Sequence, residues 1–140
     1  MKYFTLKELT YSATAKKHNI DNTPNEDEIK HLEELGNFMD GARAAWGSAL
    51  IVSSGFRCPE LNEKVGGSKN SGHKYGYAMD VVPANNKKMQ FFEFMKEYVK
   101  DKDFDELILE TNSKGSVWIH FSLKSWQGKQ RRKIKMLDAN

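Results

Sequence analysis

Two of the chain's four histidines lie beside other groups that can hold a metal ion or transfer a proton. His73 follows a glycine-rich loop and precedes Asp80 by seven residues. His120 lies in the apolar stretch at residues 117–121, and the side chains of an extended strand alternate between two faces. This alternation places His120 and Trp118 together, opposite the apolar side chains. Such groups suit a metal site, acid–base catalysis or a structural role.

Carboxylates are expected on the same face as His120. Residues 104–110 and 117–121 are two apolar stretches joined by a polar turn, which predicts an antiparallel hairpin. Matching the apolar faces of the two strands puts Glu106 and Glu110 on the face that carries His120.

The residue types limit what kind of metal site is possible. Two histidines and one carboxylate leave a fourth position on Zn²⁺ open, as catalytic zinc requires. A structural zinc would need four protein ligands, and Cys58 is the only thiol, which also excludes a disulfide within the chain. The spacing of His73 and Asp80 alone makes a metal site only one possibility. His18 and His31 lack such neighbours, and we expect both at the surface.

Helical and extended segments must position these side chains. The predicted elements are a capped helix after Thr5, a long amphipathic helix from Thr23 to Gly47, a strand at residues 50–53, a helical turn after Pro59, a strand at residues 77–82, a helix after Asn85 or Asn86, and the final hairpin. Helices followed by strands, with an antiparallel last pair, indicate an α+β fold. We expect a small antiparallel sheet that carries the candidate metal site and packs against helices.

The composition fits one folded domain that does not enter a membrane. The chain has 140 residues, of which 39% are hydrophobic, and a formal net charge of +3. These values exclude a disordered chain and give no argument for nucleic acid as a partner. No stretch approaches the ~20 apolar residues of a membrane-spanning helix, and the first residues lack a signal-peptide pattern. We expect a monomer that is synthesised in the cytoplasm.

The C-terminal residues 124–140 form a basic tail in this reading. Six lysines and arginines and no acidic residue lie between positions 124 and 135. A solvated, partly mobile end is the interpretation we favour. Attraction to an anionic polymer is the alternative.

A set of short motifs resembles the D-alanyl-D-alanine carboxypeptidase family of zinc peptidases, which includes cell-wall carboxypeptidases and many phage endolysins. The family signature Ser-x-His-x-x-Gly-x-Ala-x-Asp, followed downstream by Trp-x-His, is met at every fixed position. The matching residues are Ser71, His73, Gly76, Ala78, Asp80, Trp118 and His120, preceded by the stretches at residues 54–59, 61–62 and 65–67. The resemblance extends to about residue 124 and implies a catalytic domain at residues 1–123 with the hedgehog/D-Ala-D-Ala-peptidase-like fold.

The resemblance implies a role for each matching residue. His73, Asp80 and His120 would hold one catalytic Zn²⁺, with water as the fourth ligand. Arg57 and Ser71 would bind a carboxylate or the oxyanion of the substrate, and Trp118 would pack beside the zinc. The implied substrate is a peptidoglycan stem peptide.

One position departs from the family pattern. Many members carry the catalytic carboxylate three residues before the last histidine, where this chain has Val117. Glu110 is the substitute we predict as general base, since it is expected opposite Trp118 and diagonal to His120. Glu106 is the alternative.

The sequence therefore predicts a zinc peptidase that cuts a peptidoglycan bond involving a D-amino acid. A D-Ala-D-Ala carboxypeptidase and an L-Ala-D-Glu endopeptidase would share these ligands, and a phage lysin is the source we favour. A non-catalytic zinc-binding module on the same fold, which binds cell wall or a protein, is the alternative.

Overall fold

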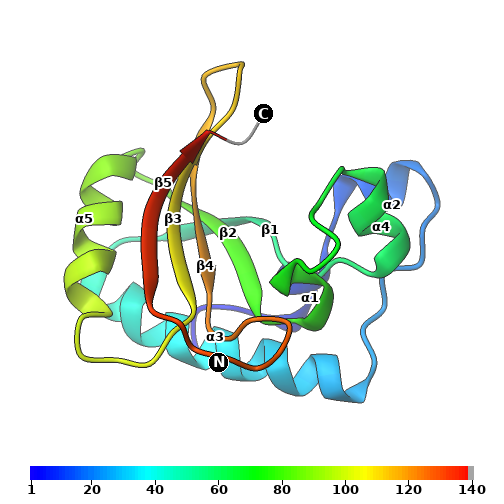
Figure 1. Ribbon diagram of the computed structural model, residues 1–140, viewed down its shortest axis with the longest axis horizontal. Coiled ribbons are helices and arrows are strands. Elements are labelled where there is room, and N and C mark those ends of the chain that lie inside the picture. The colour runs from blue at the N-terminus through cyan, green and yellow to red at the C-terminus, as the bar shows by residue number, and fades with distance from the viewer. Residues whose placement is uncertain (139–140) are drawn as a thin grey trace.

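Five strands form one mixed sheet in the computed structural model, which describes residues 1–138 (Figure 1). The strands are β1 (Leu50–Ser54), β2 (Ala78–Pro83), β3 (Glu106–Thr111), β4 (Val117–Ser122) and β5 (Lys133–Asp138). Their order across the sheet is β1-β2-β4-β3-β5. The strands β1 to β4 pair with one another in antiparallel fashion, whereas β5 runs parallel to β3. The predicted α+β class is confirmed, with a mixed rather than a purely antiparallel sheet.

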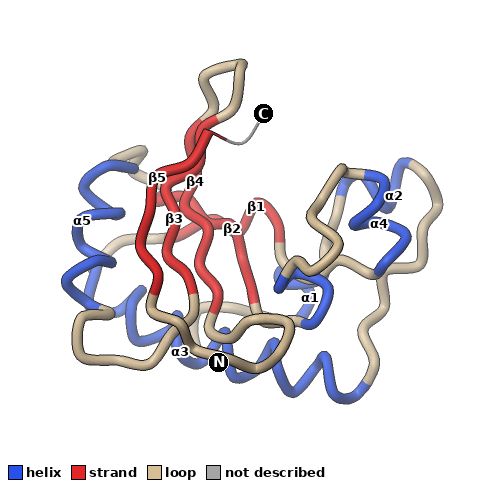
Figure 2. Tube along the Cα trace, in the orientation of Figure 1, coloured by secondary structure: helices blue, strands red, loops and turns tan. Residues whose placement is uncertain are grey.

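The helices form two groups around this sheet (Figure 2). The long helix α3 (Glu26–Trp46) and α5 (Lys88–Tyr98) supply the core beside the sheet. The short helices α1 (Leu6–Thr10), α2 (Ala13–Lys17) and α4 (Pro59–Lys64) lie on the side of β1, at the right in both views, and the 3₁₀ turn η1 (Gly72–Tyr75) precedes β2.

The start of α3 differs from the prediction by two residues. Asn25, not Thr23, is the N-cap: its Oδ1 accepts from the Glu28 backbone N–H at 2.8 Å, and Glu28 Oε1 accepts from the Asn25 backbone N–H at 2.8 Å. This capping box satisfies two backbone donors at once. The Thr23 hydroxyl instead donates to Asp21 Oδ1, so it is not available to cap the helix.

The hairpin has the register that the sequence predicts. Glu110 lies opposite Trp118, and Ile108 lies opposite His120. One face of the sheet is buried against α3 and α5, with core side chains from Met79, Val81, Leu107, Leu109, Ile119 and Phe121. The other face, which carries His120 and the two glutamates, is therefore free to form a site.

The C-terminal segment is part of the sheet rather than a free tail. Arg131 makes a two-pronged ion pair with the buried Asp105, with Nε–Oδ1 and Nη2–Oδ2 distances of 2.7 and 2.8 Å, and β5 follows directly. The expectation of a partly mobile end therefore does not describe residues 133–138. All six β5 residues are exposed, so the strand lacks the buried alternation from which strands are predicted. The last two positions of the predicted tail, 139–140, lie outside the described residues.

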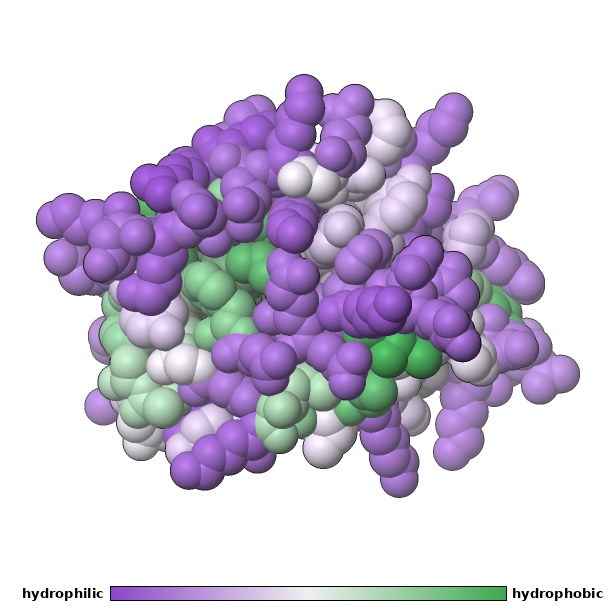
Figure 3. Space-filling model, turned by 90° about the horizontal axis from the view of Figure 1, so that it is seen from below, coloured by the Kyte–Doolittle hydropathy of each residue, from purple (hydrophilic) through white to green (hydrophobic). Residues whose placement is uncertain are grey.

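The face of the molecule on the α3 side is mostly polar. Figure 3, which views the molecule from the side where α3 runs in Figure 1, shows hydrophilic residues with small groups of hydrophobic ones between them. Among residues 1–138, no helix combines the length and apolar character needed to cross a membrane.

Candidate metal centre

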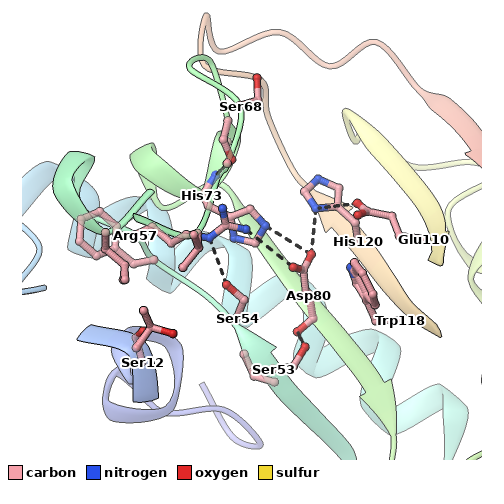
Figure 4. Close-up of a pocket in the computed structure, with 18 of the residues that line it drawn as sticks. Ser12, Ser53, Ser54, Arg57, Ser68, His73, Asp80, Glu110, Trp118 and His120 are labelled. Atoms are coloured by element: carbon pink, nitrogen blue, oxygen red, sulfur yellow. Dashed lines mark hydrogen bonds and ion pairs between the residues drawn. The ribbon is translucent and has the colours of Figure 1, made fainter. Parts of the chain in front are cut away.

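Three potential metal ligands meet on the free face of the sheet. His73 comes from η1, Asp80 from β2 and His120 from β4, and Asp80 and His120 are direct partners across the two strands. Asp80 Oδ1 lies 3.3 Å from His73 Nε2 and 3.0 Å from His120 Nδ1 (Figure 4). All three ligand atoms lie within 4.8 Å of one another. These three residues, which lie up to 47 positions apart in the sequence, thus form one cluster.

The His73 ring is oriented for metal binding. Its Nδ1 lies 2.8 Å from the Gly55 carbonyl oxygen, which can only accept, so Nδ1 carries the proton. Its Nε2 is buried and has no hydrogen-bond partner among the described residues. A neutral imidazole with a free lone pair, whose other nitrogen donates to a carbonyl, is the arrangement found around metal-ligating histidines. Together with one carboxylate and a second imidazole, this donor set fits Zn²⁺.

The turn between His73 and Asp80 is anchored on α3. Gly76 has a φ of +78°, and a Cβ there would lie 2.7 Å from the Glu28 carbonyl oxygen. His31 Nδ1 donates to the Tyr75 carbonyl oxygen at 2.7 Å. His31 is therefore half-buried and holds this turn, so the expectation of a surface residue was wrong. Its partner lies 44 residues away, and no local pattern indicates such a contact.

The electrostatics favour replacement of a proton by a cation. Burial alone would raise the pKa of the Asp80 carboxyl, but the two imidazoles outweigh it and hold this pKa far below its ordinary value. Burial lowers the pKa of His73. Burial also opposes protonation of His120, yet the hydrogen bond and the charge of Asp80 raise its pKa. The ionised Asp80 thus favours a proton on His120. A metal ion bound to the same imidazole nitrogen would take the place of this proton.

The two candidate general bases have different surroundings. Glu110 Oε1 lies 3.8 Å from His120 Nδ1, and burial raises the pKa of the Glu110 carboxyl. Glu106 instead pairs with two cations from the C-terminal segment: Lys135 Nζ is 3.3 Å and Arg131 Nη2 is 3.7 Å from its oxygens. Glu106 is thus already engaged in two ion pairs, whereas Glu110 lies beside a candidate ligand. The geometry therefore favours Glu110 over Glu106.

Arg57 reaches the cluster from the loop before α4. Its Nη2 lies 3.8 Å from Asp80 Oδ2, and its Nε donates to Ser54 Oγ at 3.2 Å (Figure 4). Its Nη1 donates to Asn62 Oδ1 at 2.9 Å. Its backbone N–H also donates to the His73 carbonyl oxygen at 3.0 Å. Arg57 is thus tied to the ligand-bearing turn and directs a cationic edge toward the metal centre.

These residues line one open cleft of about 810 Å³. Ser71 and Trp118, both predicted from the sequence, lie in its wall. Ser71 also caps η1, since its Oγ accepts from the His73 backbone N–H at 3.2 Å, and the buried Trp118 Nε1 has no hydrogen-bond partner within residues 1–138. All the predicted site residues therefore come together.

No pattern in the sequence indicated the far wall of the cleft. This wall consists of Tyr11 and the start of α2, including Ser12 and Thr14. Ser12 Oγ accepts from the Ala15 backbone N–H, a capping contact that could have indicated the helix. A five-residue helix carries too short a periodic pattern to be found from apolar spacing.

Comparison with protein families agrees with this geometry. The sequence pattern of the Peptidase M15 family matches residues 2–122, a range that includes every ligand and cleft residue named above. A search of curated proteins gave no match. The chain therefore belongs to the Peptidase M15 family, the D-Ala-D-Ala carboxypeptidase-like metallopeptidases.

Proposed function

We propose that this protein is a zinc peptidase that hydrolyses peptidoglycan stem peptides at a bond involving a D-amino acid. The observation that carries the proposal is the convergence of His73 Nε2, Asp80 and His120 Nδ1 in an open cleft beside Glu110. These three residues would hold one Zn²⁺. When bound, zinc supplies Lewis acidity, which polarises a carbonyl and lowers the pKa of water.

Glu110 is the general base and then the general acid in this proposal. Its carboxylate faces the ligand cluster from the neighbouring strand, so it can take a proton from the attacking water. Burial raises its pKa, which brings it closer to the range in which a carboxyl group both accepts and returns a proton. The same group then donates the proton to the leaving amine, and the peptide bond is replaced by a carboxylate and an amine.

Arg57, Ser71 and Trp118 position the substrate. Arg57 presents a planar donor pair, which suits a carboxylate or a developing oxyanion. The Ser71 hydroxyl is occupied as an acceptor, so its own proton is free to be donated to the same group. The Trp118 indole offers an apolar surface in the cleft wall and a buried N–H without a protein partner.

The test is digestion of defined muropeptides by the zinc-loaded protein, followed by mass spectrometry. Loss of a terminal D-alanine would identify a carboxypeptidase, and separation of L-Ala from D-Glu would identify an endopeptidase. The zinc-loaded Glu110→Gln variant is the matched control, because it keeps the ligands and the side-chain shape. No product from any muropeptide with the zinc-loaded protein would refute the proposal.

Action as a monomeric phage lysin belongs to the same proposal. It predicts that the added protein lowers the turbidity of bacteria whose outer membrane has been permeabilised, and that a chelator prevents this.

A non-catalytic zinc-binding module is the second candidate. Val117 favours it, because an apolar residue stands where many family members carry the catalytic carboxylate. This candidate predicts that calorimetry detects muropeptide binding while mass spectrometry detects no product.

A further inference from the structure

We propose that Asn62 is a positioning residue that aims the Arg57 guanidinium into the cleft. Asn62 lies in α4 and is only 3% exposed, although asparagine is a polar residue with weak helix preference. A buried polar side chain in a helix needs partners on both of its polar atoms. In Asn62 one of these partners is Arg57.

The Asn62 amide makes two hydrogen bonds and so joins Arg57 to the loop that follows α4. Its Oδ1 accepts from Arg57 Nη1 at 2.9 Å, and its Nδ2 donates to the Ser68 carbonyl oxygen at 2.9 Å. The second bond fixes the amide so that its oxygen, not its nitrogen, faces the guanidinium. The Gly67 backbone N–H also donates to the Asn62 carbonyl oxygen at 2.8 Å, which holds the following loop against α4.

This bridge determines which edge of Arg57 remains free. Asn62 holds one Nη1 hydrogen and Ser54 holds the Nε edge, so the Nη2 side is left to face Asp80. Figure 4 shows the contacts of Arg57 with Ser54 and Asp80. An arginine held at two points loses less conformational freedom when it binds a substrate oxygen. The fixed edge is therefore prepared for the substrate before the substrate arrives.

Gly67 makes the arrangement possible by its close approach. A Cβ at this position would overlap Asn62 Oδ1 and would lie 2.5 Å from Arg57 Nη1. The nearest atoms that an added methyl group would meet belong to side chains, so it would displace the Asn62 amide and the Arg57 guanidinium. Gly67→Ala would thus misdirect Arg57 while every hydrogen-bonding group is retained.

The effect on catalysis rests on the proposed peptidase function, whereas the positioning itself is measurable without a substrate. The first readout is the ¹⁵N NMR spectrum of the full-length, zinc-loaded protein labelled in arginine. Restricted rotation of the Arg57 guanidinium gives separate Nη signals, and free rotation averages them. The variants are Asn62→Leu, which keeps the branched shape and removes both bonds, Asn62→Asp, which keeps the acceptor for Arg57, and Gly67→Ala. Lys69→Ala, in the exposed part of the same loop, is the control.

We expect separate Arg57 signals in the unmodified protein, in Asn62→Asp and in Lys69→Ala, and averaged signals in Asn62→Leu and Gly67→Ala. If Asn62→Leu does not fold, Asn62→Asp and Gly67→Ala still give opposite predictions. Averaged signals in Asn62→Asp, or separate signals in Gly67→Ala, would overturn the proposal. The visible spectrum of the Co²⁺-substituted proteins should be the same in all variants, since the metal ligands are unchanged.

Kinetics provide the second readout. Loss of a hydrogen bond to a charged group should lower kcat/KM by about 10- to 100-fold in Asn62→Leu. In an Arg57→Lys background the same substitution should lower it less than about threefold further, because the group to be positioned is gone. Independent, fully multiplying effects would contradict the positioning role. A wild-type protein with no peptidase activity would refute the proposed function alone, and the NMR result would still decide the role of Asn62.

Discussion

Replacement of each of the two glutamates on β3 by glutamine separates the general base from its neighbour. Glu110 and Glu106 lie on the same strand and the same face, and their side chains are 16% and 19% exposed. Glu110→Gln keeps the shape and removes the ability to accept a proton. General acid–base catalysis contributes about 10²- to 10⁴-fold, so we expect kcat/KM to fall by that factor, or about 3–5 kcal/mol of transition-state stabilisation.

Glu106→Gln should have the opposite profile. It removes the partner of Lys135 and of Arg131, two ion pairs at or near the surface that are worth about 0.2–1 kcal/mol each. We expect about 1 kcal/mol less stability in thermal unfolding and a kcat/KM within about threefold of the unmodified protein. In the metal-free protein, burial raises the pKa of Glu110, so its ionised form opposes folding at neutral pH. Glu110→Gln should therefore unfold at the same temperature or higher.

The assay is steady-state hydrolysis of a muropeptide that the protein cleaves, with equal zinc content verified for each variant. A loss of about 100-fold or more in Glu106→Gln, together with near-normal activity in Glu110→Gln, would refute the assignment of the base. Equal large losses in both would show that the charges of β5 affect the chemistry.

Three further substitutions test the surroundings of the centre. Asp80→Asn should weaken zinc binding by more than about 100-fold, as measured by competition with a chromophoric chelator. Loss of a group that only supports a ligand costs up to about 100-fold, and Asp80 is itself a proposed ligand. Gly76→Ala should weaken it by about tenfold, because the added methyl group meets the Glu28 carbonyl oxygen and moves the ligand-bearing turn. Asp105→Asn should cost about 2 kcal/mol at pH 7, since Asp105 is buried and bound by Arg131, whose partial exposure limits the loss. Burial alone would raise the pKa of Asp105, but the hydrogen bonds and charge of Arg131 lower it overall. Ionised Asp105 thus stabilises the folded protein above its unfolded-state pKa, and this stabilisation is lost as the pH falls through the lower folded-state pKa. The thermal unfolding temperature of the variant should therefore depend less on pH below about pH 4. If the thermal stability of the Asp105→Asn variant fell with pH as steeply as that of the unmodified protein, Asp105 would not be the source of the acid sensitivity.

The sequence was sufficient for the hairpin and the ligand face because both follow from alternation. Apolar residues at every second position fix which face of β3 and β4 is buried, and a one-residue slip would expose them. Once this register is set, Glu110 must lie opposite Trp118. The proposed metal ligands were predicted from their motif, since spacing alone left the site open.

The contacts that support the site could not be read from local patterns. His31 was expected at the surface, yet it binds a carbonyl 44 residues away. The strand β5 has no buried face, and the Arg131–Asp105 ion pair that precedes it joins positions 26 residues apart. Such contacts depend on how distant segments pack, which hydrophobic periodicity does not encode.

The paired charges of the C-terminal segment also bear on its role. Four of its six cations between residues 124 and 135 have acidic partners, namely Lys124 with Glu34, Arg131 with Asp105, Arg132 with Asp103 and Lys135 with Glu106. Cations already neutralised within the protein attract a polyanion less strongly. This pairing supports a structural role for the segment.

Titration of the metal-free protein with zinc, with hydrolysis of a defined muropeptide followed by mass spectrometry, is the decisive test of zinc-dependent cleavage. Product formation should rise in proportion to added zinc and level off at one equivalent per chain. The His73→Ala variant, which lacks the proposed ligand atom Nε2, should give no product at that ratio. Zinc-independent cleavage, or stoichiometric zinc binding without cleavage of any muropeptide, would contradict the proposed zinc-dependent cleavage.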